Sequence, residues 1–206
     1  MHQRLSKATN RDVDRILEQM ERAFDSDAWH GPSVRETLRG LRAHYAFERL
    51  IPGAHTIWEI VLHLEGWKLE VIRRLEGHPA GMPSKGDWPD VLDNTDASWQ
   101  VARQRLAAAQ AQLLEAVTRF PAWRLDEVVR DDRPLAEKLA SIPVVSSPVK
   151  TPSGNVEAIS DDFLDSGARR NPTLGTGVSF FTMLLGAVQH DVYHAGQIAL
   201  LKKRIK

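Results

Sequence analysis

The fold class is indicated most clearly by residues 56–75, TIWEIVLHLEGWKLEVIRRL. Apolar residues recur in this stretch at spacings of three and four, which predicts a long α-helix with one broad apolar face. Thr56 is followed three residues later by Glu59, the spacing of a capping box at a helix N-terminus, and Gly77 ends the pattern. The strongest predicted helix of the chain therefore carries His63 on a face that should point inward.

Three further long helices are predicted, one before this stretch and two after it. Residues 10–24 form an amphipathic helix, for which Asn10 is the predicted cap. Residues 96–119 form another, capped by Thr95, and residues 178–203 form a long apolar helix at the end of the chain. Four long helices joined by breaks indicate an all-α fold, namely a four-helix bundle.

The segments between the long helices are predicted to be short or irregular. Ser33 and Glu36 repeat the capping-box spacing and predict a short extra helix. Residues 78–89 form a Pro/Gly loop, and helical periodicity fails again at about 124–177, which predicts a long irregular excursion before the last helix. At this length we expect a single domain, 1–206, that includes the excursion.

Composition excludes several functional classes. The 206 residues are 42% hydrophobic and 26% charged with a formal net charge of zero, so no global electrostatic attraction favours nucleic acid. The chain has no cysteine, which excludes disulfides, thiolate catalysis and cysteine-ligated zinc. There is no signal-peptide pattern and no apolar run long enough to cross a membrane, so we expect a cytoplasmic protein without membrane contact.

Three of the eight histidines stand out. His190 and His194 lie four residues apart in the last predicted helix, where this spacing places both on one face. His63 lies on the apolar face of the helix at 56–75. A lone histidine there is more often a core residue than a ligand, but helices that face each other in a bundle are where metal sites are built. The other histidines are at the terminus, beside turns or in the short helical segment, namely His2, His30, His44, His55 and His78.

At these residues the chain resembles the DinB-like family, and within it the YfiT-like branch of metal-dependent hydrolases. The matching motifs are Gly31-Pro32-Ser33, residues 55–64 with Trp67, and residues 190–198 continuing through Lys202. The resemblance implies a four-helix bundle with a short extra helix, and a divalent metal held by His63, His190 and His194. It also implies a homodimer that acts on a small molecule, such as a thiol adduct. The chain departs from the family pattern between Arg124 and Gly177, a long segment punctuated by prolines.

Three imidazole ligands would leave coordination positions open, as in catalytic rather than structural sites. We expect zinc or nickel there, with iron or manganese as alternatives and copper also suited to imidazole. No other cofactor is expected, and no catalytic residue can be assigned beyond the ligands.

Residues near the predicted ligands have competing interpretations. Glu59 is expected to serve the capping box rather than catalysis, and Asp191 to form a salt bridge or an interhelical contact. Tyr193 is expected to pack rather than to place its hydroxyl in a pocket. Gly186 and Gly196 predict close packing of the last helix against a neighbour. Trp58 and Trp67 are expected to be core residues, with a substrate platform as the alternative. Trp29 and Trp88 are expected to pack beside the core, with shielding of a pocket entrance or a dimer contact as the alternative.

Three functions remain open from the sequence. The first is a metal-dependent enzyme, either a hydrolase or a small-thiol transferase. The second is a non-catalytic protein that binds metal or a small ligand, for example in a stress response. The third is a plain helical interaction module in which the histidines are core residues.

Overall fold

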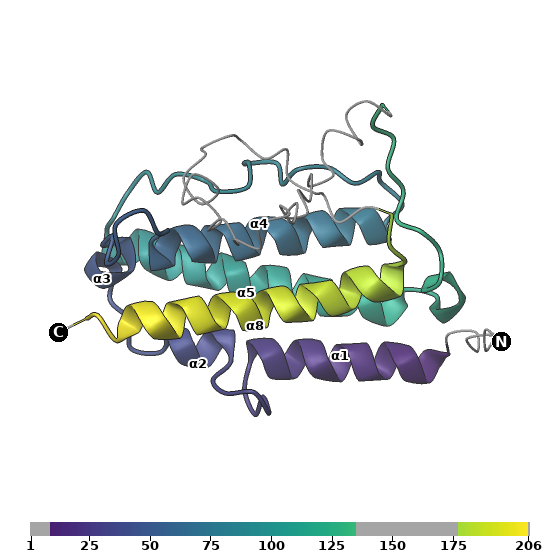
Figure 1. Ribbon diagram of the computed structural model, residues 1–206, viewed down its shortest axis with the longest axis horizontal. Coiled ribbons are helices and arrows are strands. Elements are labelled where there is room, and N and C mark those ends of the chain that lie inside the picture. The colour runs from purple at the N-terminus through teal and green to yellow at the C-terminus, as the bar shows by residue number, and fades with distance from the viewer. Residues whose placement is uncertain (1–8, 135–176, 206) are drawn as a thin grey trace, which may run out of the picture. The chain divides into compact units, whose positions relative to one another are not determined.

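The computed structural model describes residues 9–134 and 177–205, and within them it is all-α (Figure 1). The only β-type pairing in these ranges is an isolated antiparallel bridge between Val128 and Ser179. The elements are α1 (Asn10–Phe24), α2 (Val34–Leu38), α3 (Ala43–Phe47), α4 (Ile57–Leu75), α5 (Asp96–Arg119), a 3₁₀ turn η1 (Ala122–Arg124) and α8 (Phe180–Lys202). The all-α prediction is therefore confirmed for the described residues.

The chain divides into two compact units, and all of these helices belong to the first one. That unit comprises Met1–Asp131 and Gly175–Lys206, and the second comprises Asp132–Leu174. Most of the predicted excursion at about 124–177 lies outside the described residues. The assignment of 1–206 to a single domain stays a prediction.

The helix starts follow the predicted capping residues with one correction. Glu59 donates its backbone N–H to Thr56 Oγ1 at 3.1 Å, and Thr56 N–H donates to the Glu59 carboxylate at 2.7 Å. The same reciprocal pair forms at Ser33 and Glu36. The cap of α1 is Thr9 and not Asn10, because the backbone N–H and the hydroxyl of Thr9 both donate to the Asp12 carboxylate.

Two other boundaries differ from the sequence prediction. The last helix begins at Phe180, two residues later than expected, because the Ser179 hydroxyl accepts from the Thr182 N–H and caps it there. The single short helix expected after Ser33 is two, α2 and α3. Between them Gly40 has a φ of 72°, a left-handed conformation that ends a helix and that glycine adopts without steric cost.

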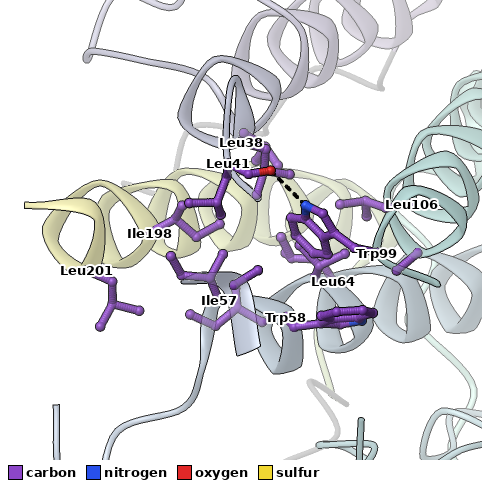
Figure 2. Close-up of a cluster of buried hydrophobic side chains, with 14 of the residues drawn as sticks. Leu38, Leu41, Ile57, Trp58, Leu64, Trp99, Leu106, Ile198 and Leu201 are labelled. Carbon is purple, nitrogen blue, oxygen red and sulfur yellow. Dashed lines mark hydrogen bonds between the residues drawn. The ribbon is translucent and has the colours of Figure 1, made fainter. Parts of the chain in front are cut away.

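The four long helices contact one another in pairs. Helix α4 packs against α5 and α8, and α1 also packs against α5 and α8 (Figure 1). The apolar faces meet in a core that includes Trp58, Trp99 and Ile198 (Figure 2). The Trp99 indole N–H donates to the Leu41 carbonyl at 2.9 Å, so the one polar atom of this ring is satisfied inside the core. The prediction that Trp58 is a core residue is confirmed.

The two glycines of α8 do not mark close packing. An added Cβ at Gly186 or at Gly196 would meet no described atom within 4 Å. Their neighbours on the same face, Tyr193 and Leu200, are exposed, so this face of α8 points away from the other described helices. Among the described residues the prediction of close approach there was wrong, because the low helix propensity of glycine does not show whether a neighbour packs against it.

Close approach occurs instead on α4, under the loop that follows it. A Cβ at Gly66 would lie 3.1 Å from the Pro83 side chain. Further along α4 the buried Glu70 carboxylate accepts from the Gly81 backbone N–H at 2.7 Å and from Arg74 Nε at 3.0 Å. Because of these contacts the loop after α4 lies along that helix, and residues 87 and 88 reach His63.

No helix in the described ranges is both long enough and apolar enough to cross a membrane.

Candidate metal centre

Three histidine side chains converge between α4 and α8. His63 comes from α4, and His190 and His194 come from adjacent turns of α8. The Nε2 atom of His190 is 2.9 Å from that of His63 and 3.1 Å from that of His194, and one ligand atom of each residue lies within 4.8 Å of the others. His63 and His194 are buried, and His190 is half-buried. The three histidines selected from the sequence thus form a group that can hold a metal ion.

The outer nitrogens of two rings are fixed by hydrogen bonds. His63 Nδ1 is 2.7 Å from the backbone carbonyl oxygen of Asp87, and His194 Nδ1 is 2.6 Å from Gln197 Oε1. Both oxygens are acceptors, so each Nδ1 carries the hydrogen, and in the neutral ring Nε2 keeps its lone pair. This is the way in which metal-ligating histidines are usually oriented by residues behind them.

The three Nε2 atoms fit a bound cation better than they fit one another. Two of them lack a hydrogen in the neutral rings, and His190 can supply one hydrogen at most from its Nε2. One of its two close contacts, at 2.9 and 3.1 Å, would then join two lone pairs. A transition metal bound at about 2.0–2.1 Å from each nitrogen would hold its ligands about 3 Å apart and satisfy both contacts. The donor set therefore fits a divalent transition metal.

Burial keeps these imidazoles neutral, which is the form that binds metal. Burial, together with the neighbouring His194, His63 and Lys68, lowers the pKa of His190 to about 3. Burial likewise lowers the pKa of His194 to about 4. The pKa of His63 is also lowered by burial, although the Asp87 carbonyl and carboxylate oppose the change.

Trp88 lies between a ligand and a second histidine. Its ring stacks on His63 with a centroid distance of 3.9 Å and an interplanar angle of 10°. His55 stacks on the opposite face at 3.5 Å and 4°, and its Nδ1 is 3.4 Å from the Glu59 carboxylate. The sequence placed His55 merely beside a turn. The prediction that Trp88 packs beside the core is confirmed, because this partly buried ring lies against the buried cluster. His55 and Trp88 also form one stack with His63, which shields one side of that ligand from water.

Asp87 was missed by sequence reasoning, and so was Gln197. The Asp87 carboxylate accepts from the Trp67 indole N–H at 2.7 Å and lies 3.2 Å from His63 Nδ1. Trp67 was expected to be a core residue, but it is half-buried and acts as the donor that holds Asp87. A signal for Gln197 was present, because it lies three residues after His194 on the same helix. Asp87 lies 24 residues from His63, and no local spacing indicates that contact.

Some of the remaining predictions for residues near the site are confirmed and others are wrong. Glu59 serves the capping box as predicted, and it also pairs with Arg49 at 2.8 Å. Asp191 forms the predicted interhelical salt bridge, with Lys68 Nζ at 2.6 and 2.7 Å from its two oxygens. Tyr193 was expected to pack, and its ring does lie edge to face against that of His194 at a centroid distance of 5.0 Å, although the residue is 62% exposed. Trp29 is fully exposed in the described structure, so the prediction that it packs was wrong.

No protein-family model, no curated protein and no solved structure matches this chain. The residues of the site, and not a relative, therefore carry the functional argument.

Proposed function

We propose that this chain is a metal-dependent enzyme of the DinB-like kind, a four-helix bundle that holds a divalent transition metal with His63, His190 and His194. The single observation that carries the proposal is the convergence of three Nε2 atoms whose rings are oriented from behind by the Asp87 carbonyl and by Gln197. In histidines that serve only as core residues, there would be no reason for the Nε2 lone pairs of His63 and His194 to point at the His190 ring. This argues against the helical interaction module.

The donor set narrows the metal by class. All three ligand atoms are imidazole nitrogens, which suit zinc and nickel, while iron and manganese remain alternatives. Three protein ligands leave room for water or substrate, as in catalytic sites. When bound, such an ion would act as a Lewis acid that polarises a substrate carbonyl or activates water.

The chain's own residues would keep the site rigid and partly dry. Trp88 covers one side of His63, while the Asp87 carbonyl and Gln197 hold the two imidazoles in one tautomer. Hydrolysis and transfer of a small thiol are both compatible with such a site. The choice of these two reactions, and the proposal of a homodimer acting on a small-molecule substrate, rest on the family resemblance.

One observation favours a second candidate, a non-catalytic protein that binds metal or a small ligand, as in a stress response. Three carboxylates near the ligands, in contact or within one helical turn, are already engaged. Asp191 pairs with Lys68, Asp87 accepts from Trp67, and Glu59 is held by Thr56 and Arg49. None is presented as a general base, so an enzyme here would depend on the metal for its acid–base chemistry.

The metal assignment is tested by removing one ligand at a time. Protein without a histidine tag is stripped with chelator, reloaded with zinc or nickel, and analysed for metal content and melting temperature. We expect His63→Ala and His194→Ala to lose most bound metal yet to keep their helical circular dichroism. His30→Ala, which removes an exposed histidine far along the chain, should bind metal like the parent.

Equal metal content in the parent and in both ligand variants would refute the site. If the site stands, turnover of thiol-adduct, ester and amide substrates by the reloaded protein separates the two candidate functions. Turnover that disappears with chelator and in His63→Ala supports the enzyme. Metal binding without any such turnover supports the binding protein.

A further inference from the structure

A pocket lies away from the three histidines. This pocket of about 660 Å³ opens where the end of α1, the short helix α2 and the middle of α5 meet. None of its lining residues belongs to the metal centre, which is built on α4, α8 and the loop after α4. Its volume falls in the range of about 300–1,000 Å³ that is usual for small-molecule sites.

The floor of this pocket is apolar and fixed. Phe24, Leu38 and Leu106 line it, and each is also part of the buried core. Figure 2 shows Leu38 and Leu106 within the cluster that includes Trp99. Because these side chains are already packed on their inner sides, the floor is preformed and would need little rearrangement to receive an apolar group.

The rim of the pocket is positively charged. Three arginines line it, Arg35, Arg39 and Arg103, with Asp25 as the acidic residue among the lining side chains. Arg35 is neutralised by Asp25, since its Nη1 lies 2.7 Å from the carboxylate. The other two have no ion pair within the residues that the structure describes. Apart from a longer-range attraction between Arg39 and the Glu36 carboxylate, these two charges are left to solvent or to a ligand.

Arg103 has a hydrogen-bond donor that the protein does not use. Its guanidinium lies over the Trp99 ring, 5.6 Å from the centroid, and donates to the neutral side chain of Gln100. Its Nε atom is buried and has no hydrogen-bond partner among the described residues. A buried donor on a cation that lacks an acceptor is costly, so the site favours an incoming anionic oxygen.

We propose that this pocket binds a small amphipathic organic anion. The carboxylate or phosphate group would lie between Arg39 and Arg103, because guanidinium groups bind such oxyanions through charge-assisted hydrogen bonds. The apolar part would lie on Phe24, Leu38 and Leu106. The site is independent of the metal centre and does not depend on the function proposed for it.

Dodecanoate is a suitable probe, used below its critical micelle concentration in isothermal titration calorimetry. We expect one site per chain and at least about tenfold weaker binding of dodecanol, which has the same apolar chain without the charge. Binding should be the same with and without bound metal and in His63→Ala. Loss of binding in His63→Ala would overturn the proposal, because the carboxylate would then be held by the metal centre.

Two test variants, each compared with a matched control, locate the site. Arg39→Gln/Arg103→Gln should weaken dodecanoate binding by about tenfold or more and leave dodecanol binding almost unchanged. Arg119→Gln is the control, because it removes an exposed arginine from the end of the same helix α5. Equal weakening in the control, or none in the double variant, would overturn the proposal.

The second pair keeps the test decisive if the arginine variant does not fold. Ala107 lines the pocket and is exposed, while the adjacent Ala108 is exposed but does not line it. Ala107→Trp should fill the pocket and abolish dodecanoate binding, and Ala108→Trp should retain it. Binding that survives Ala107→Trp, or no binding to the parent protein, would refute the site.

Discussion

At the scale of single residues, the orientation of each imidazole matters as much as its presence. His194 can offer Nε2 to a metal because Gln197 Oε1 accepts the hydrogen on its Nδ1. The Asp87 carbonyl does the same for His63, and the Trp67 indole holds the Asp87 carboxylate in place. The site is therefore defined by its hydrogen-bond acceptors as well as by its three ligands.

Removing the Gln197 acceptor tests this view. In Gln197→Leu the His194 ring is free to change tautomer and to rotate, so we expect metal affinity to fall by about 10- to 100-fold. Competition with a chromophoric chelator measures the change. Gln189→Leu makes the same substitution at an exposed position of the same helix and should have no effect. Unchanged affinity in Gln197→Leu would show that this hydrogen bond does not support the ligand.

At the scale of helices, a buried ion pair joins the two helices that carry the ligands. Lys68 of α4 and Asp191 of α8 are 4% and 2% exposed, and the ammonium lies 2.6 and 2.7 Å from the two carboxylate oxygens. Burial raises the pKa of the Asp191 carboxyl, and Lys68 opposes that change. The pair fixes how α4 and α8 face each other next to His190, because an alternative packing would leave both charges buried and unpaired.

Breaking this pair should cost more than replacing it. Lys68→Met leaves the Asp191 carboxylate buried without a partner, and we expect it to lower the free energy of unfolding by about 3–5 kcal/mol. The double variant Lys68→Met/Asp191→Leu should recover most of that loss. Urea unfolding of metal-free protein measures both.

An exposed ion pair gives the matched comparison. Arg119→Met breaks the pair with Glu115 on the surface of α5, and we expect a loss below about 1 kcal/mol. If Lys68→Met were as mild as Arg119→Met, the buried pair would not be holding α4 to α8.

The same comparison of elements shows where sequence patterns succeed. Capping boxes at Ser33 and Thr56 located two helix starts, because a hydroxyl and a carboxylate three residues apart interact locally. The prediction of close packing at Gly186 and Gly196 failed within the described part of the chain, because tertiary packing, which composition does not encode, decides which face of a helix meets a neighbour. The close approach at Gly66 arises from a loop that no periodicity describes.

At the scale of the whole molecule, the metal-free protein should be sensitive to acid. The folded-state pKa values of His190 and His194, about 3 and about 4, lie below the value of about 6.5 for the unfolded chain. Between these pKa values the unfolded chain binds more protons than the folded protein. The free energy of unfolding is therefore undiminished by these histidines above about pH 6.5, and it decreases as the pH falls below that value. The raised pKa of Asp191 acts in the opposite direction and reduces the net slope.

We therefore expect the melting temperature of metal-free protein to change little between pH 7.5 and about pH 6.5 and then to fall as the pH is lowered to 5, as measured by circular dichroism. His190→Gln should flatten this dependence, because glutamine does not titrate. His78→Gln, an exposed histidine beyond the end of α4, should leave it unchanged. A parent protein that keeps its melting temperature across this range would contradict the burial of neutral imidazoles.

By itself the sequence determined the helical class, the four long helices to within a residue or two, and the three histidines that can form a site. Those features depend on spacings of three and four residues, which local geometry converts into a helix face. Only the tertiary structure decided what surrounds the histidines. Asp87 and Trp88 reach His63 because Glu70 and Gly66 hold a loop against α4, and Lys68 meets Asp191 across 123 residues. Such contacts depend on how separate elements pack, which no local spacing encodes.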